Sequence, residues 1–477
     1  MTRDDATRDD ATRDDATRDP RRDAATSAPR RRPPARRATP AHSAVSPAEK
    51  RAFRAATSGR AGARVLVGLM SGTSADGVDA VVARIEDIAE AALDARAAAA
   101  CAALPRSALI PSRRATVLAH EHVSFEPAFR ERLLALPRAL PGELALLHVE
   151  LGRRFGDAVL AALRSARLRP AEVAGACTPG LTAAHLPPGA HGPGATLALG
   201  DGDVLAARCG LRVVCDVRAA DRAAGGQGAP LVPWADAVLL RPRARAAAAP
   251  VAVLNLGGIA NITVVPPDGD PIAFDTGPGN MLLDGAVALA TRGALSFDAG
   301  GALALAGRVD EAWLAELLDQ DDFLRVPPPR STGRERYGEA WLARHAARLR
   351  RARPADLAAT LAAYTVEAVA RSLEDFVPLQ PRELIVSGGG ALNLALLRGL
   401  ARRLPDIIVH DSLVALGLAP LVREGLAFAL IGDATLRGEP ANVPSVTGAR
   451  RAVVLGKVCA AGAGEAGGSE GARVEGG

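Results

Sequence analysis

VAVLNLGGIANITVVPPDGDPIAFDTGPGNMLLD, residues 251–284, is the stretch that decides the fold. Two apolar runs, Val251–Leu256 and Ile259–Val265, flank the pair Gly257-Gly258. Apolar runs joined by a tight glycine turn are typical of a β-hairpin, and glycine also lets the backbone approach a ligand closely. We therefore expect a hairpin here, with its turn available to a ligand.

A carboxylate follows this hairpin. A third short strand is expected at Ile272–Phe274, followed by Asp275, a Gly/Pro loop and a helix at Met281–Thr291. In α/β folds, reactive groups gather at the ends of strands, where loops lead into helices. The alternative is that Asp275 only caps its own turn, as Asp often does. Three further glycine-rich turns favour a shared ligand, because each of them makes sense around the same bound molecule.

The first of these turns, Ser71–Asp79, begins the globular chain. It joins a strand that starts at Val65 to a second, alternating strand. The actin, hexokinase and chaperone superfamily wraps nucleotide phosphates with such a turn, whose amides and hydroxyls face the anion while an Asp holds Mg²⁺ through water. A plain hairpin turn does not need its hydroxyls and carboxylates. The candidate phosphate-binding residues are Gly72, Thr73, Ser74, Ala75, Asp76, Gly77, Val78 and Asp79, and Asp76 and Asp79 are also candidate Mg²⁺ ligands.

The other two turns lie further along the chain. Ser387-Gly388-Gly389-Gly390 follows the strand expected from Glu383 and precedes a helix. This arrangement predicts a binding site for adenosine or phosphate at a helix N-terminus. The long loop Ala223–Leu231 follows Asp216 and Asp221. A glycine-rich loop of this length is more often functional than idle, so we interpret it as a hinge or a substrate clamp.

Most of the remaining pattern is helical. Ala, Leu and Arg recur at helical spacing over residues 90–170, and a helix is expected from about Pro354 to Phe376. His120, His122 and His148 fall in the first of these regions, where we interpret them as ordinary surface or core residues.

Composition excludes several classes of function. The 477 residues are 48% hydrophobic with a net charge of +5. Residues 1–63 hold 15 of the 58 basic and 9 of the 53 acidic residues, which leaves 43 basic and 44 acidic residues in the remainder. A body this close to neutral has no electrostatic footprint for nucleic acid. The five cysteines lack a C-x-x-C pair, so zinc is not expected and the compartment is a reducing one. With no apolar run suited to a membrane span, we expect a cytoplasmic protein.

Both ends are expected to be disordered. Residues 1–63 repeat TRDDA and then become rich in Arg, Pro and Ala, and residues 459–477 are rich in Gly and Glu. A nucleic-acid-binding arm is one interpretation of the first segment, and a mis-assigned start codon is the one we favour. In that case translation begins near residue 60.

Over residues 64–458 the chain resembles the anhydro-N-acetylmuramic acid kinases of the sugar kinase/Hsp70/actin superfamily. The resemblance rests on eight motifs in the family's order: GLMSGTSADGVDA, DVRAADRAAGGQGAPLVP, VLNLGGIANIT, FDTGPGN, STGRERYG, SGGGALN, EGLAFAL and VPSVTGA. It implies an α/β, two-domain, actin/hexokinase-like (ASKHA) fold with an interdomain ATP cleft. Residues 64–220 plus 440–458 would form the first domain and residues 221–439 the second. It also implies a homodimer.

The resemblance further implies a reaction. The family opens the 1,6-anhydro bridge with water and phosphorylates O6 from ATP, giving N-acetylmuramate 6-phosphate and ADP in murein recycling. Asp275 matches the family's base, and catalysis of phosphoryl transfer is mostly positioning. The implied phosphate and nucleotide residues, besides the first turn, are Gly257, Gly258, Asn261, Gly388, Gly389 and Asn393. The candidate substrate or clamp residues are Asp221, Gly277, Asn280 and Glu424.

One loop departs from the family. Where its members commonly have SHGQT followed by a second His, this chain has Thr178–Thr182 with Pro179 and Leu181, and keeps His185; Ala198 replaces a nearby Gln. Because the family's His and Gln face the sugar, the change predicts altered sugar selectivity. Two alternatives stay open on this ground: a kinase of the same fold for another anhydro or hydroxylated sugar, and a non-catalytic nucleotide-binding paralogue.

Overall fold

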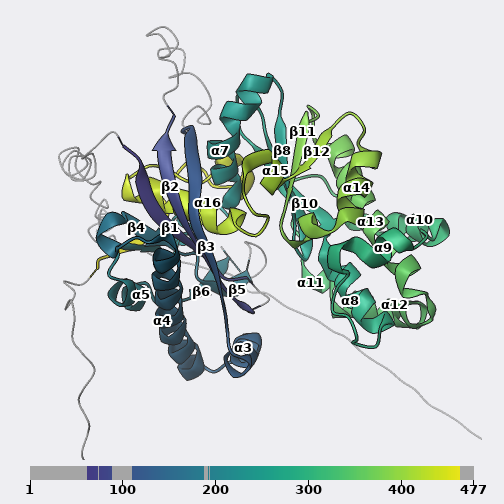
Figure 1. Ribbon diagram of the computed structural model, residues 1–477, viewed down its shortest axis with the longest axis horizontal. Coiled ribbons are helices and arrows are strands. Elements are labelled where there is room, and N and C mark those ends of the chain that lie inside the picture. Colours follow the sequence, from purple (N-terminus) through teal and green to yellow (C-terminus); the bar gives the residue numbers. More distant parts are fainter. Residues whose placement is uncertain (1–61, 73–74, 89–109, 187–191, 193, 462–477) are drawn as a thin grey trace, which may run out of the picture. The chain divides into compact units, whose positions relative to one another are not determined.

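Two β-sheets form the framework of the protein (Figure 1). The computed structural model describes residues 62–72, 75–88, 110–186, 192 and 194–461, all within one compact unit. The six-stranded sheet has the order β13-β7-β4-β1-β2-β3, and the five-stranded sheet has the order β10-β9-β8-β11-β12. A short two-stranded sheet pairs β5 with β6.

The strand bounds are as follows. The six-stranded sheet consists of β1 Arg64–Met70, β2 Gly77–Asp87, β3 Arg113–Ser124, β4 Gly175–Cys177, β7 Val213–Cys215 and β13 Lys457–Cys459. The five-stranded sheet consists of β8 Val251–Leu256, β9 Ile259–Val265, β10 Ile272–Pro278, β11 Glu383–Ser387 and β12 Ile408–Asp411. The small sheet consists of β5 Leu181–Leu186 and β6 Ala195–Leu199.

Five strands of each large sheet share one topology, and the six-stranded sheet adds β13 at its edge, antiparallel to β7. In the first, β1–β2 and β2–β3 are antiparallel, while β1–β4 and β4–β7 are parallel. In the second, β8–β9 and β9–β10 are antiparallel, while β8–β11 and β11–β12 are parallel. An antiparallel meander extended by two parallel strands therefore occurs twice. The α/β class is confirmed, and the repetition is what the actin/hexokinase-like fold requires.

Helices cover both faces of each sheet. Alternate residues of a strand face opposite sides, and β1 shows the consequence. Val67 and Leu69 share a core with α4, Pro141–Ala166, whereas Leu66 shares a core with α16, Arg423–Leu436. The same core as α16 continues to α7, Val232–Ala247, and to residues of β8 and β11. α7 and α16 thus form a layer of helix shared by both sheets.

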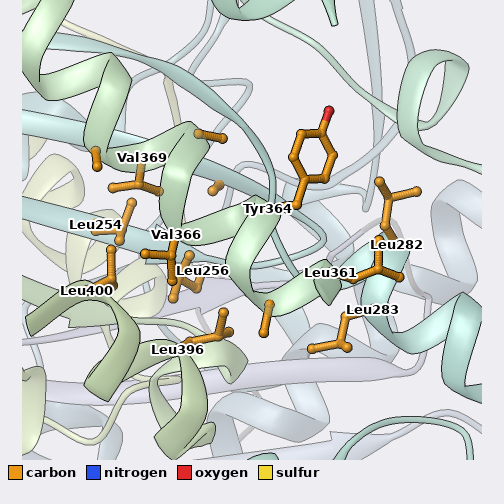
Figure 2. Packing of buried hydrophobic residues seen from close by; sticks show 14 of the residues in the cluster. Leu254, Leu256, Leu282, Leu283, Leu361, Tyr364, Val366, Val369, Leu396 and Leu400 are labelled. Carbon is orange, nitrogen blue, oxygen red and sulfur yellow. The ribbon is translucent and has the colours of Figure 1, made fainter. Parts of the chain in front are cut away.

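The far face of the five-stranded sheet carries its own core (Figure 2). Leu254 and Leu256 of β8 pack there against α8 Asn280–Ala290, α13 Pro354–Phe376 and α14 Leu394–Arg403. Each fully buried Leu or Val contributes about 1.5–3 kcal/mol relative to an exposed one. This core fixes the β8–β9 hairpin and the first turn of α8 relative to each other.

The other helices connect or extend these layers. The α-helices are α3 Pro127–Leu134, α5 Gly202–Cys209, α6 Ala219–Ala223, α9 Ala302–Ala306, α10 Glu311–Gln320, α11 Arg334–Tyr337, α12 Glu339–Arg351, α15 Ser412–Leu416 and α17 Pro444–Thr447. The 3₁₀ turns are η2 Leu136–Arg138, η3 Pro170–Glu172, η4 Ala299–Gly301, η5 Asp322–Arg325 and η6 Gly389–Leu392.

One contact between a strand and a helix is unusually close. A Cβ placed on Gly68 of β1 would lie 1.8 Å from the carbonyl oxygen of Gly425 in α16. Real Cβ atoms do not approach backbone this closely, so the two elements can meet only because Gly68 lacks a side chain. The contact places the first residues of α16 beside the end of β1.

Several sequence-based expectations are confirmed. The β8–β9 hairpin and α13 have the expected bounds, and α8 is displaced by only one residue. The helical interpretation of residues 90–170 was wrong where β3 lies, at Arg113–Ser124. That segment pairs with β2 along its whole length, and this tertiary pairing overrides local propensity. The strand expected at Ile272–Phe274 runs on to Pro278, so Asp275 lies inside it.

Among the described helices, none combines the length and the apolar character needed to cross a bilayer. The expected disordered segments, residues 1–63 and 459–477, lie outside the described residues except at 62–63 and 459–461, and the second prediction was wrong at Cys459, which is the last residue of β13. The domain boundaries at 220/221 and 439/440 stay predictions.

Candidate active site

A cavity of about 480 Å³ brings together residues from both sheets. Met70 reaches it from the end of β1, Arg218 from the start of α6, and Glu424 from the first turn of α16. The five-stranded sheet contributes Asn261 and Asp275, which are partners across β9 and β10. Three candidate residues, Asn261, Asp275 and Glu424, therefore line one cavity.

Asp275 lies at an irregularity in β10. The register with β9 shifts between Asp275 and Gly277, and such a bulge re-aims the side chain. Its Oδ2 accepts a hydrogen bond from the backbone N–H of Thr332 at 2.9 Å, and the Ser331 side chain also bonds to it. Burial raises the pKa of Asp275 to about 6, and these hydrogen bonds oppose the rise. A carboxylate with this pKa is poised to accept a proton near neutral pH.

Arg330 holds the backbone of Asp275 in place. Its Nε donates to the Asp275 carbonyl oxygen at 2.9 Å, and its Nη atoms donate to three further carbonyls and to Ser372 Oγ. The guanidinium also lies against the rings of Phe274, Phe323 and Phe376, at 5.2, 4.9 and 4.7 Å from their centroids. Arg330 is 7% exposed. Its guanidinium is therefore satisfied by these protein acceptors and ring contacts.

Glu424 links this cavity to the glycine-rich turns. Its Oε1 lies 3.4 Å from Nδ2 of Asn255, the residue before the last of β8. Burial raises the pKa of Glu424, the neighbouring Arg423 lowers it, and the charge of Asp79 raises it further. Glu424 is therefore within electrostatic reach of the first turn and in contact with the hairpin strand. Asn255 has no counterpart among the sequence-predicted residues.

The Gly257-Gly258 turn is fastened to the start of α8. Gly257 O accepts from Asn280 N at 2.7 Å, and Gly258 O accepts from Met281 N at 3.1 Å. The Asn280 side chain donates to Leu256 O at 3.0 Å. The structure thus brings Gly257, Gly258 and Asn280 together. A Cβ on Gly257 would meet nothing closer than 3.6 Å, so that side of the turn is open.

The Gly388–Gly390 turn joins the same cluster. A Cβ on Gly390 would lie 2.9 Å from Oδ1 of Asn280, and Gly389 lies beside the same side chain. Gly388 has a φ of 79°, and a Cβ there would lie 2.7 Å from Asn255 Oδ1, so only glycine fits. Gly388 is the N-cap of the 3₁₀ turn η6, and Gly389 and Gly390 are its first residues, so these glycines open a 3₁₀ turn and do not form the N-terminus of the α-helix α14, contrary to the expectation. Asn393 caps α14 by accepting from the N–H groups of Ala395 and Leu396.

The first turn is partly described. Thr73 and Ser74 lie outside the described residues. Ser71 Oγ donates to Gly77 O at 2.8 Å and Ala75 N donates to Gly72 O at 3.1 Å, which closes the turn on itself. Ala75 and Val78 contribute to the core between the six-stranded sheet and α4, whereas Asp76 is exposed.

Two histidines hold the carboxylate of Asp79. Its Oδ1 lies 2.8 Å from His120 Nε2 and 3.1 Å from His122 Nδ1. Both histidines come from β3, so the strand missed in the sequence also carries these contacts. Two ring N–H groups aimed at one oxygen fix the carboxylate and leave its other oxygen available. Alternation along a strand, HEH in this case, is the signal that could have revealed them.

Two candidate clamp residues have internal partners. Both oxygens of Asp221, which is 0% exposed, are engaged: Oδ1 by Asn442 and Thr447, and Oδ2 by Gly228 N. Asp221 thereby ties the glycine-rich loop to the C-terminal segment. At Gly277 a Cβ would lie 3.2 Å from side-chain atoms of Ala368 and Leu324, which places that position against the core of the five-stranded sheet.

The loop that departs from the family lies largely inside the protein. Leu181 is 3% exposed within the core beside α4, and Pro179 is also buried. Neither is among the residues that line the cavity, but His185 is. His185 Nδ1 lies 2.8 Å from Thr196 Oγ1. The two departures from the family pattern therefore affect buried packing, and the cavity keeps its histidine.

Comparison with known proteins gives the family. A model of the family described as anhydro-N-acetylmuramic acid kinase matches residues 64–461. The chain belongs to the anhydro-N-acetylmuramic acid kinase family. A relative of that name from Gloeobacter violaceus is 41% identical over 406 residues, covering 83% of this chain and 98% of its own. Another from Synechococcus sp. is 40% identical, covering 82% and 98%, and one from Caldanaerobacter subterraneus is 35% identical, covering 83% and 96%.

Membership of the anhydro-N-acetylmuramic acid kinase family agrees with the resemblance found in the motifs. Solved structures add little. The activator of 2-hydroxyisocaproyl-CoA dehydratase from Clostridium difficile, 12% identical and covering 78% of this chain and 96% of its own, gives a TM-score of 0.37, which is too low to argue from. The kinase assignment therefore rests on the family, and the five-strand arrangement that occurs in both large sheets describes the fold.

Proposed function

We propose that this chain uses ATP to open and phosphorylate 1,6-anhydro-N-acetylmuramic acid, giving N-acetylmuramate 6-phosphate and ADP in murein recycling. The observation that carries the proposal is Asp275, a carboxyl group with a pKa of about 6 on the wall of a 480 Å³ cavity. A cavity of this size suits one small molecule. Membership of the kinase family supplies the reaction class.

The anhydro bridge is an acetal, and its opening by water needs a base. Asp275 accepts a proton from water as the water oxygen attacks the anomeric carbon and the bond from that carbon to O6 breaks. O6 leaves with the electron pair and attacks the γ-phosphorus, so ADP departs and no second base is needed. Thr332 N–H and Arg330 hold the carboxylate and its backbone, which keeps Asp275 a positioned base.

The phosphates of ATP are proposed to lie between the two glycine turns, along Gly72–Asp79 and Gly257-Gly258, with the nucleoside near Gly388, Gly389 and Asn393. The carboxylates of Asp79 and Asp76 fit Mg²⁺, which binds through one or two carboxylates together with phosphate oxygens and water. The described residues hold no group of three or more His, Cys, Asp or Glu that could by themselves bind a metal ion. When bound, Mg²⁺ would neutralise charge on the phosphates. Glu424 is proposed to orient the metal ion or the phosphates between the two glycine turns.

The cytoplasm and a homodimer remain part of the proposal. ATP is the phosphoryl donor and the scattered cysteines suit a reducing compartment. Among the described cysteines, Cys177, Cys209, Cys215 and Cys459 are free thiols. The substrate alternatives are not favoured, because Pro179 and Leu181 are packed in the core.

The test is ADP release and mass spectrometry of the sugar with purified protein, ATP and Mg²⁺. We expect a phosphorylated, ring-opened product that depends on 1,6-anhydro-N-acetylmuramic acid, and its loss in Asp275→Asn. ATP turnover only with a different anhydro sugar would refute the substrate assignment. ATP binding with no turnover of any sugar would refute the kinase.

A further inference from the structure

One short segment holds the carboxyl group of Asp275. Thr332 N–H donates to Asp275 Oδ2 at 2.9 Å, and Arg330 donates to the Asp275 carbonyl oxygen at 2.9 Å. Burial raises the pKa of Asp275, and the groups that act on this pKa next all come from residues 330–335. We call residues 330–337 the base-holding segment. The place of the carboxylate in the cavity therefore depends on how this segment is fastened to the rest of the protein.

The base-holding segment is buried at its two ends and largely exposed between them. Arg330 fixes the first end, because its Nη1 donates to carbonyl oxygens of η5 at 3.2 and 3.1 Å. Tyr337 fixes the second end, where its hydroxyl donates to Asp321 Oδ2 at 2.6 Å. An exposed stretch held by two buried contacts can move only as far as those contacts allow.

Asp321 connects these two contacts. It is buried, and its Oδ1 accepts from Phe323 N at 3.2 Å, which caps the η5 turn that holds Arg330. Its Oδ2 accepts from Tyr337 and also from Tyr364 of α13, whose hydroxyl points away from the labelled leucines of the core (Figure 2). Burial raises the pKa of both phenols, so both stay protonated and donate.

We propose that Tyr337 is a positioning residue for the base. By donating to Asp321 it keeps the base-holding segment in place, and the N–H of Thr332 then stays on the carboxylate. The inference rests on the proposed function only in taking Asp275 as the base. The Tyr337 hydroxyl lies 3.8 Å from the position of a Cβ on Gly277, so this contact lies beside the bulge of β10 that aims Asp275.

Arg336 makes a second and weaker contact from the same end of the segment. Its Nη1 lies 3.2 Å from Asp321 Oδ1 and 2.6 Å from Asp322 Oδ1, but its side chain is 37% exposed. Exposed ion pairs contribute little, whereas a hydrogen bond to a buried carboxylate is strong. Removal of the Tyr337 hydroxyl should therefore loosen the segment even though Arg336 remains.

Tyr337→Phe and Tyr364→Phe form a matched pair. Each removes one hydroxyl from the same oxygen of Asp321, at the same distance and from a side chain at most 2% exposed, but only Tyr337 belongs to the segment. Hydrogen exchange of the Thr332 amide, followed by NMR, gives a readout that needs no turnover. We expect Tyr337→Phe to exchange this amide about tenfold faster or more. Its kcat should fall about tenfold to a hundredfold with both KM values little changed, because the base is misplaced while binding is kept.

Tyr364→Phe should keep the native exchange rate and kcat, although urea unfolding should show a similar loss of stability in both variants. Equal losses of kcat in the two variants would overturn the proposal, because the effect would then come from Asp321 or from stability in general. Unchanged exchange of the Thr332 amide in Tyr337→Phe would overturn it as well, and so would faster exchange with an unchanged kcat. A native protein that phosphorylates no sugar refutes the proposed function, and the exchange rate of the Thr332 amide still tests whether Tyr337 holds the segment.

Discussion

Replacing Asp275 by Asn should abolish activity and stabilise the protein at the same time. Burial raises the pKa of this carboxyl to about 6 from its ordinary 3.8. At 1.36 kcal/mol for each pH unit, that difference corresponds to about 3 kcal/mol of cost for keeping the group ionised in the fold. Asn has nearly the same shape, accepts the Thr332 N–H in the same way, and carries no charge. The variant should therefore unfold with a free energy about 3 kcal/mol higher near pH 7.5.

The dependence of stability on pH shows the direction of this effect. The folded protein binds the Asp275 proton more tightly than the unfolded chain, so stability contributed by the protonated group is complete below about pH 3.8 and is lost as the pH rises to about 6. The stability difference between Asp275→Asn and the native protein should therefore be near zero around pH 4 and reach its full size above pH 6. Asp284, whose pKa burial and then Asp298 raise to about 7, titrates in both proteins and cancels in the difference.

Urea unfolding at pH 4, 5, 6 and 7.5 measures this difference in stability. The rate of ADP release over the same pH range reports the protonation of the catalytic base. We expect kcat/KM of the native protein to fall tenfold per pH unit below about pH 6, and Asp275→Asn to lose about a hundredfold to ten-thousandfold in kcat. A variant that is no more stable than the native protein at pH 7.5 would contradict the burial argument. An acid limb that persists unchanged in the variant would assign it to another group.

Three further outcomes follow from contacts described above. Gly68→Ala should lower the free energy of unfolding in urea by about 3 kcal/mol or more, because the new Cβ meets Gly425 O at 1.8 Å. The control is Gly142→Ala at an exposed position of α4, which should raise the free energy of unfolding by about 0.5–1 kcal/mol. Arg423→Met should cost about 3–5 kcal/mol by leaving Asp236 buried and unpaired, and Arg423→Met with Asp236→Leu should recover most of the loss; no recovery would refute the pairing argument. His120→Ala with His122→Ala should raise the Mg²⁺ concentration for half-maximal turnover about tenfold without changing KM for the sugar, and a changed sugar KM alone would place the pair elsewhere.

The local features of this site could be predicted from the sequence, whereas the features that depend on strand pairing and tertiary contacts could not. The hairpin turn Gly257-Gly258 could be predicted because glycine between two apolar runs constrains its own neighbourhood. β3 could not, because its apolar residues alternate weakly and its partner β2 supplies the order. His120 and His122 were therefore interpreted as ordinary. Asn255 reaches Glu424 only once β8 and α16 are adjacent, and no spacing in the sequence encodes that contact.

The order of synthesis gives one structural feature an additional meaning. The helix α16 covers β1, and β13 is an edge strand of the six-stranded sheet. Both elements come after the whole five-stranded sheet in the chain. A ribosome therefore releases β1 and β2 long before it makes their cover. Until the chain has emerged as far as Leu436, the end of α16, the face of β1 and β2 that carries Leu66 and Val81 has no helix to bury it. Such an exposed apolar face invites aggregation, so holdase chaperones should bind the nascent chain mainly through this face.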